Sequence, residues 1–242
     1  MNENAQPIKA WGYWATTAFA VVAFLVGQFG ALGVVMLWRQ GSLSSLLDTP
    51  YDGKLVTLFI LISNPLTIVA LVAPVLLARA KPAEYLAIEW PAARYVWIGI
   101  AWLIVLIAAS DALLFLSGRD LVTPFQLQSY STALSEGWLP AMAFAAIIVA
   151  PAGEEVMFRG FLFRGFVRSE RAVWPGIVVI SLLWAALHIQ YDWTGVLQIF
   201  VVGLFLGAVR WKSGSTLLTF LLHALFNLEG SLETVVQMHF FS

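Results

Sequence analysis

Long apolar runs separated by short polar segments constrain this chain more than any other feature. Of its 242 residues, 60% are hydrophobic and 11% are charged, whereas a soluble domain carries about 25% charged residues. A helix of about 20 apolar residues crosses a hydrocarbon core about 30 Å thick. Backbone amides in lipid must find their hydrogen-bond partners within the protein, so such runs are expected to be helical. The pattern therefore predicts an all-α, polytopic bundle of transmembrane helices.

The apolar runs predict seven or eight transmembrane helices in one integral membrane domain over residues 1–242. Neither a linker nor an internal repeat divides the chain. The first run is longer than a signal-peptide core, so we expect it to remain as a span. The last run, residues 231–241, is short for a span, which is why the expected number is seven or eight. The other runs cover residues 14–38, 55–78, 95–116, 138–159, 174–190, 195–211 and 216–227.

Lysine and arginine residues are concentrated in alternate loops. The positive-inside rule therefore predicts that the N-terminus and the loops after even-numbered spans face the cytoplasm. Arg39 and Lys54 in the first loop are exceptions, and acidic residues accompany them. The loops that we expect in the cytoplasm carry Arg79, Lys81 and Arg94 after the second span, Arg164, Arg168 and Arg171 after the fourth, and Arg210 and Lys212 after the sixth.

The composition excludes several classes of function. The formal net charge is −1, which gives no basis for nucleic-acid binding. The chain has no cysteine, so disulfides, thiol catalysis and cysteine-bound metals are excluded. The lipid bilayer is the partner that the composition predicts, and no feature of the sequence specifies an oligomeric state.

Glu154 and Glu155 are adjacent carboxylates near the end of the fourth apolar run. A charged residue at the centre of a span costs about 2.5–3.5 kcal/mol, and such residues are functional candidates. On a helix, Glu155 and Arg159 have the favourable i,i+4 orientation for an ion pair. Glu154 points about 100° away from Glu155, so it is free to face a cavity as a general base. The alternative is that both acids only pair with arginines at the cytoplasmic interface.

Two of the three histidines lie inside apolar runs. His188 follows Trp184 by four residues, so the two side chains share a helix face. His223 precedes Asn227 by four residues, and an imidazole and a carboxamide on one face supply the two donors that an oxyanion hole requires. The alternative for these histidines is a hydrogen bond between helices, typically worth less than about 1 kcal/mol in membranes.

The depth of these residues constrains the fourth helix. At a rise of about 1.5 Å per residue, Glu154 and His188 reach the same depth only if this helix continues past Arg159 toward Arg168. We expect that continuation, with Arg164 and Arg168 on its solvent-facing side.

Two further features have simpler interpretations. Gly203 and Gly207 form a small-xxx-small pair, which predicts close contact between helices. Asp111 is a polar residue in an apolar run, and we assign it no role because it lies far along the chain from the other candidates.

These residues resemble the three motifs of the CAAX prenyl endopeptidase and bacteriocin-processing family of intramembrane glutamate proteases. The resemblance covers residues 138–228, and the order and spacing of the motifs agree. One departure is Trp184, because the family usually has phenylalanine at that position. The matching residues are Glu154, Glu155 and Arg159 in the first motif, Trp184 and His188 in the second, and His223 and Asn227 in the third.

The resemblance implies an endopeptidase with its active site inside the bundle, acting on a membrane-associated peptide or protein. It implies that Glu154 and His188 activate a water molecule, and that His223 and Asn227 stabilise the oxyanion. The supporting residues would be Glu155, Arg159 and Trp184. The family also implies a metal-independent enzyme without a cofactor, located in the bacterial inner membrane.

Alternative functions remain open at this point. Two histidines and a glutamate (His188, His223 and Glu154) could hold zinc, although their spacing is not that of the His-Glu-x-x-His motif. A non-catalytic scaffold or a bacteriocin-immunity protein would keep the bundle, but we would expect it to have lost a motif residue. A proton-coupled transporter would show inverted repeats or broken helices. Prenylated CAAX peptides are the best-known substrates of the family, and other membrane-associated peptides are alternatives.

Overall fold

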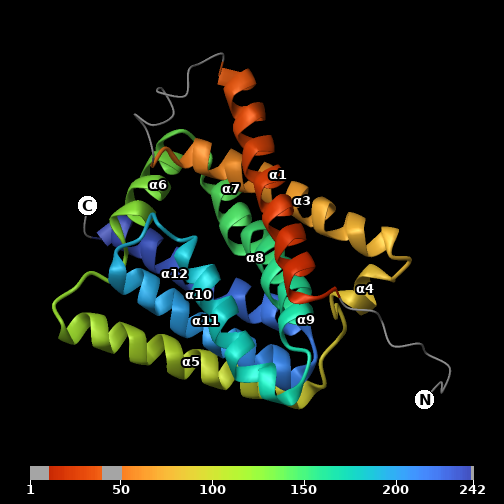
Figure 1. Cartoon of the computed structure of the whole chain (residues 1–242). Helices are drawn as coiled ribbons and strands as arrows, with labels where there is room; N and C mark the ends of the chain where they lie inside the picture. Colours follow the sequence, from red (N-terminus) through yellow and green to blue (C-terminus); the bar gives the residue numbers. More distant parts are fainter. Residues whose placement is uncertain (1–10, 40–50, 241–242) are drawn as a thin grey trace.

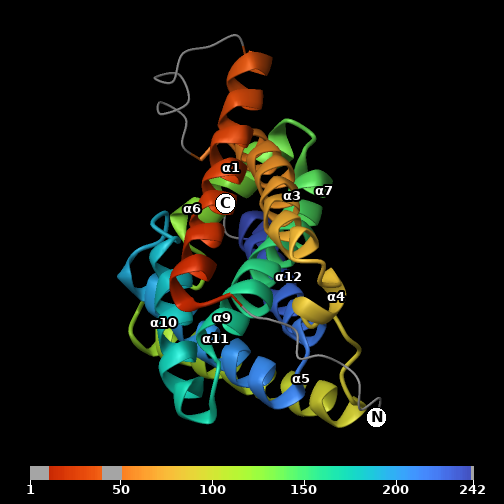
Figure 2. The ribbon, with the colours of Figure 1, turned by 45° about the vertical axis from the view of Figure 1, so that its right-hand side comes forward.

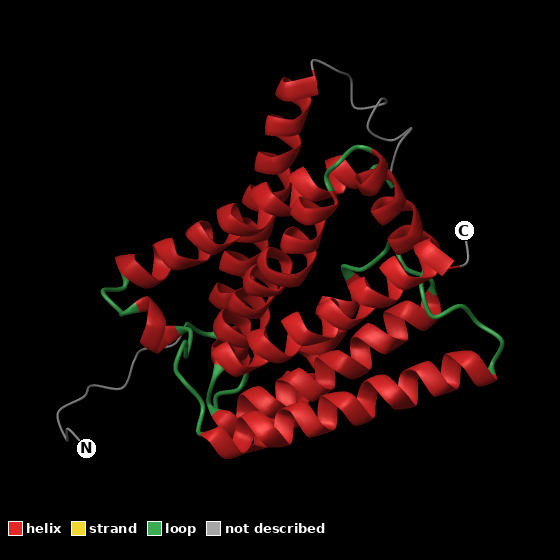
Figure 3. Cartoon of the chain, turned by 180° about the vertical axis from the view of Figure 1, so that it is seen from behind, coloured by secondary structure: helices red, strands yellow, loops and turns green. Residues whose placement is uncertain are grey.

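The computed structural model describes residues 11–39 and 51–240, and every regular element in these ranges is a helix (Figure 1; Figure 3). This confirms the predicted all-α class. The long helices are α1 (Tyr13–Arg39), α3 (Gly53–Leu77), α5 (Ala93–Leu116), α11 (Trp193–Ser213) and α12 (Thr216–Phe240). The shorter elements are α4 (Pro82–Tyr85), α6 (Pro124–Ser135), η3 (Glu170–Ala172) and α10 (Val173–Ala186).

The fourth apolar run forms one composite helix that carries both glutamates. It consists of α7 (Leu139–Phe144), η1 (Ala145–Val149), α8 (Ala150–Glu155), η2 (Val156–Leu162) and α9 (Phe163–Phe166), of which η1 and η2 are π-helical. It contacts α1 and α3 on one side and α10, α11 and α12 on the other (Figure 2). All side chains from Met157 to Leu162 are buried as a result.

Five helical segments in the described part of the chain are long and apolar enough to cross a membrane. They are Tyr13–Arg39, Gly53–Leu77, Ala93–Leu116, Leu139–Phe166 and Trp193–Ser213. Helix α10 has 14 residues, or about 21 Å at the standard rise, which is shorter than the hydrocarbon core. Helix α12 has 25 residues but is less apolar, with two glutamates in its second half. The membrane character is supported, whereas the expected number of seven or eight spans is not.

Close helix contacts follow the small residues. A methyl group added to Gly203 would lie 2.9 Å from the Cβ atom of Ser181 on α10, and one added to Gly207 would lie 2.7 Å from Cγ2 of Ile177. The small-xxx-small pair therefore lets α10 and α11 approach each other as predicted. Gly153 plays the same part between α8 and α3, because its added methyl group would lie 2.7 Å from the Cβ atom of Asn64.

The fourth helix continues past Arg159, as the depth of Glu154 required, and ends at Phe166. Arg168 lies beyond this end and is exposed. Arg164 does not fit the prediction of a solvent-facing side chain. It is half-buried and donates to the carbonyl oxygens of Glu84 and Tyr85 at 3.2 and 3.0 Å, because α4 packs against this side of the helix.

Other boundaries differ from the predicted ones. The predicted break between residues 227 and 231 is wrong, because α12 runs through it from Thr216 to Phe240. Helix α10 ends at Ala186, so His188 lies in the following loop rather than in a helix. A helix also forms where only a loop was expected, since Thr123 caps α6 in a capping box with Gln126.

Candidate active site

Glu155 and Arg159 form the predicted ion pair in the buried centre of the bundle. Arg159 Nη1 donates to Glu155 Oε1 at 2.8 Å, and the two side chains are 0% and 1% exposed. Arg159 Nη2 also donates to the carbonyl oxygen of Gly203 at 3.2 Å. A buried charge is tolerated when it is paired and hydrogen-bonded, so this contact neutralises Glu155 and ties the composite helix to α11.

His223 on α12 contacts the same carboxylate. Its Nδ1 atom lies 2.9 Å from Glu155 Oε1. An ionised carboxylate only accepts hydrogen bonds, so Nδ1 carries the proton and Nε2 points away from Glu155. The sequence did not reveal this contact, because the two residues are 68 positions apart.

Glu154 has a different environment from Glu155, as predicted. Its side chain is 24% exposed and lies beside His188, with 4.0 Å between Glu154 Oε2 and His188 Nε2. The same oxygen accepts a hydrogen bond of 2.5 Å from Nε1 of Trp184. Glu154 therefore lies at the cavity and is held by a hydrogen bond from Trp184, a contact that the sequence did not predict.

His188 is oriented by the end of α10. Its Nδ1 atom lies 2.8 Å from the carbonyl oxygen of Trp184. Because a carbonyl oxygen only accepts, Nδ1 donates, and a neutral His188 has its lone pair on Nε2, the atom nearest to Glu154. The rings of Trp184 and His188 are in edge contact at 5.3 Å, although His188 lies beyond the end of α10 and the two do not share a helix face as predicted.

Asn227 is positioned by the π-helical turn in the facing helix. The amide of Ala150 donates to Ala145 instead of Ala146, and Pro151 has no amide hydrogen to donate. The carbonyl oxygen of Ala146 is therefore left without a partner in its own helix, and it accepts from Nδ2 of Asn227 at 2.8 Å. The second hydrogen on Nδ2 remains available to another acceptor.

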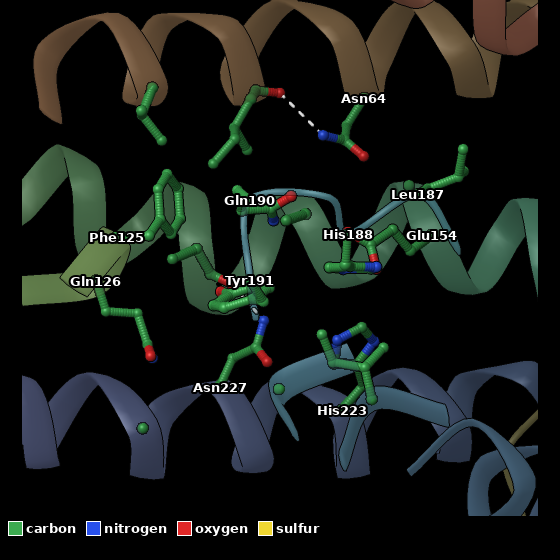
Figure 4. Close-up of a pocket in the computed structure, with 18 of the residues that line it drawn as sticks. Asn64, Phe125, Gln126, Glu154, Leu187, His188, Gln190, Tyr191, His223 and Asn227 are labelled. Carbon is green, nitrogen blue, oxygen red and sulfur yellow. Dashed lines mark hydrogen bonds and ion pairs between the residues drawn. The ribbon is translucent and has the colours of Figure 1, made fainter. Parts of the chain in front are cut away.

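One cavity of about 630 Å³ brings Glu154, His188, His223 and Asn227 together. Figure 4 shows these four side chains directed toward the same space, from α8, the loop after α10, and α12. Tyr191 lies in the same cavity. Burial raises the pKa of its hydroxyl and the nearby Glu154 carboxylate raises it further, so the phenol stays protonated.

Three carboxylates that the sequence analysis left without a role also line this cavity. They are Asp111 on α5 and Glu229 and Glu233 on α12, and their nearest oxygen atoms lie within 4.8 Å of one another. Glu229 and Glu233 are four residues apart in a helix, so the reasoning applied to Glu154 could have found them. Glu154, His188 and His223, the alternative zinc ligands, do not form such a group among the described residues.

Residues 136–228 match the family model described as type II CAAX prenyl endopeptidase, Rce1-like. This segment of the chain is therefore similar to Rce1-like domains. This segment contains all seven motif residues, and the family resemblance seen in the sequence is confirmed.

A second comparison found a relative that is similar to about half of the chain. An uncharacterized 24.3 kDa protein of Escherichia coli is 33% identical over 133 residues, which are 52% of this chain and 60% of that protein. The chain thus covers less than two thirds of that relative. No solved structure matches the present chain.

Proposed function

We propose that the chain is an intramembrane endopeptidase that hydrolyses a peptide bond in a membrane-associated peptide or protein, including prenylated CAAX-type peptides. The observation that carries the proposal is the pair of acceptors at the cavity. Oε2 of Glu154 and Nε2 of His188 are 4.0 Å apart, and Nε2 is the unprotonated nitrogen of a neutral His188. The similarity of residues 136–228 to type II CAAX prenyl endopeptidases supports the choice of reaction and of substrate class.

The two acceptors are spaced to share one water molecule as donor. Each O–H bond of that water points to one acceptor, which leaves an oxygen lone pair for attack on the peptide carbonyl carbon. As the new C–O bond forms, one water proton passes to Glu154 or His188. The carbonyl π electrons move onto oxygen, and a tetrahedral oxyanion results.

Asn227 and His223 are the proposed donors to this oxyanion. Asn227 has one Nδ2 hydrogen left after its bond to Ala146. His223 uses Nδ1 for Glu155, so donation from Nε2 requires both ring nitrogens to be protonated. The neighbouring carboxylate of Glu155 stabilises that positive charge. Such donors act most strongly in a site from which water is largely excluded.

Collapse of the tetrahedral intermediate completes the reaction. The oxyanion electrons re-form the carbonyl, the C–N bond breaks, and the leaving amine takes the proton held by Glu154 or His188. The products are one carboxylic acid and one amine, and no oxidant, reductant or metal enters the balance. The functional groups that we assign to this reaction are thus Glu154, His188, His223 and Asn227, with no cofactor.

The test uses the purified chain in detergent and an internally quenched, fluorescent, prenylated peptide. We expect cleavage by wild type and a loss of at least a hundredfold in kcat for Glu154→Gln and His188→Ala. Glu136→Gln and His239→Ala are matched controls, because both residues are exposed and lie outside the cavity. Their activity should equal that of wild type.

Three outcomes separate the alternatives. Activity that is lost with a chelator and restored by zinc would replace the proposal with the metalloprotease. Full activity in Glu154→Gln would remove Glu154 as the base. If wild type leaves a panel of prenylated and unprenylated membrane peptides intact, the non-catalytic scaffold or immunity protein becomes the better assignment.

A further inference from the structure

Trp184 makes contacts that an aromatic packing residue does not need. Its side chain is 2% exposed and is among the largest fully buried ones in the described ranges. Its ring is in edge contact with both imidazoles, at 5.3 Å from His188 and 5.2 Å from His223. Every group in the proposed reaction except Asn227 is therefore in contact with this one indole.

The indole N–H donates to the carboxylate that we propose as the base. Nε1 lies 2.5 Å from Glu154 Oε2, which is short even for a charge-assisted hydrogen bond. Oε2 is also the atom that lies 4.0 Å from His188 Nε2. The indole thus acts on the oxygen whose position relative to His188 matters for the shared water.

The indole itself has little freedom to move. The guanidinium carbon of Arg159 lies 4.5 Å from the ring centroid. A methyl group added to Gly203 would lie 3.2 Å from Cε3 of Trp184, so the glycine provides the room that the large ring occupies. Arg159 is in turn bonded to the Gly203 carbonyl oxygen at 3.2 Å. These contacts fix the direction in which Nε1 donates.

We infer that Trp184 is a positioning residue, whose indole N–H holds the Glu154 carboxylate in the orientation that faces His188. Phenylalanine, the usual residue in the family, fills similar space but has no donor. A Glu154 without this donor is free to rotate about its terminal bond. The inference rests on the proposed function, because it gives Trp184 its part in that reaction.

The first measurement does not depend on activity. In protein labelled with ¹⁵N at the indoles, Trp184→Phe identifies the Trp184 resonance by its disappearance from the spectrum. Glu154→Gln replaces a charged acceptor by a neutral one, so we expect the indole proton of Trp184 to move upfield by about 0.5 ppm or more. The resonance of Trp174, whose side chain is exposed and in edge contact with Trp211, should stay in place. An unmoved Trp184 resonance would overturn the inference.

The second measurement compares kinetic constants on the quenched peptide. We expect Trp184→Phe to lower kcat about tenfold with less than a twofold change in KM, because the donor acts on the base and not on the peptide. Trp174→Phe is the matched control, and its kcat and KM should equal those of wild type. A Trp184→Phe variant with unchanged kcat, and a thermal midpoint like that of wild type, contradicts the inference. If wild type itself is inactive, the proposed function fails, while the indole resonance still decides whether Trp184 holds Glu154.

Discussion

At the scale of single residues, one buried carboxylate connects the composite helix to α12. Glu155 Oε1 accepts from Arg159 at 2.8 Å and from His223 at 2.9 Å. Its other oxygen has no hydrogen-bond partner among the described residues. The carboxylate therefore depends on these two donors for compensation of its burial.

Removing the guanidinium should be costly. We expect Arg159→Met to destabilise the fold by about 3–5 kcal/mol, because Glu155 would keep a buried charge that has lost its cationic partner and retains only the hydrogen bond from His223. The midpoint of thermal unfolding in detergent measures the effect. Lys81→Met is the control, since Lys81 pairs with Glu84 at 2.7 Å on the exposed surface, where solvent screens the pair and its loss should hardly change the midpoint. Equal midpoints for the two variants would contradict this account.

Sequence spacing predicted some of these contacts and not others. Glu155 and Arg159 are four residues apart, so helix geometry alone brought them together. The contacts of Glu155 with His223 and of Glu154 with Trp184 join residues 68 and 30 positions apart. These contacts depend on how different helices pack against each other. The spacing of residues within one helix does not predict that packing. The cavity carboxylate Asp111 was missed for the same reason.

At the scale of elements, two π-helical turns flank the glutamates. A π-turn often marks a functional site, and here its origin is chemical. Pro151 cannot donate to the helix, and the carbonyl oxygen of Ala146 is left for Asn227. Pro151 thus leaves a carbonyl group in its own helix free to bind Asn227 on α12.

Pro151→Ala separates stability from activity. Alanine is a better helix former than proline by about 3 kcal/mol and supplies the missing amide hydrogen, so the thermal midpoint should stay or rise. The new amide competes with Asn227 for its carbonyl partner, and we expect kcat on the quenched peptide to fall about tenfold. Pro140→Ala, in the first turn of α7, should leave kcat unchanged. A Pro151→Ala variant with full activity would show that this carbonyl does not position Asn227.

The start of α11 depends on an aspartate. Asp192 Oδ1 accepts from the hydroxyl of Thr194 at 2.6 Å and from the amide of Gly195 at 2.9 Å. These bonds, and more weakly the charge of Arg119, hold the pKa of Asp192 below its usual value. The stabilisation is therefore complete above the pKa of the unfolded state and is lost as the pH falls through the lower folded pKa.

Substitution of this cap has a pH-dependent effect. Asp192→Ala should cost about 1 kcal/mol at pH 7, as N-cap removal usually does. The difference in thermal midpoint between Asp192→Ala and wild type should shrink below the folded pKa of Asp192. Asp192→Asn keeps a side-chain acceptor, so it should lose less stability than Asp192→Ala at pH 7. Thermal midpoints of the three proteins from pH 7 to pH 3 provide the measurement, and a constant difference across this range would argue against the ionised cap.

The ends of the helices show which local sequence features predict a helix boundary and which do not. The run of residues 124–135 was too polar to be predicted as a span, yet Thr123, Pro124 and Gln126 are the residues of a capped helix start. Polar residues in α12 had the opposite effect. Residues 216–227 and 231–241 were predicted as separate runs, although Glu229 lines the cavity and α12 continues through it as one helix.

At the scale of the whole molecule, the outer surface is apolar. Helix α5 buries only Gly99 and Leu103, while Trp97, Trp102 and Phe115 are 70%, 62% and 77% exposed. A soluble monomer rarely exposes a continuous apolar surface of this kind. Together with five helices of membrane-spanning length, this surface fits a lipid environment. The orientation in the membrane is a separate prediction, which rests on the distribution of basic residues.

The orientation can be tested because the chain has no cysteine of its own. Ser117 ends α5, Ser169 lies between α9 and η3, and both are exposed, so each tolerates the nearly isosteric change to cysteine. The positive-inside rule places Arg168 and Arg171, which flank Ser169, in the cytoplasm. In spheroplasts of a bacterial host, we expect a membrane-impermeant maleimide to label Ser117→Cys directly and Ser169→Cys only after permeabilisation. Wild type gives the background. The reverse pattern would place the arginine-rich end of the fourth helix outside the cell and contradict the predicted orientation.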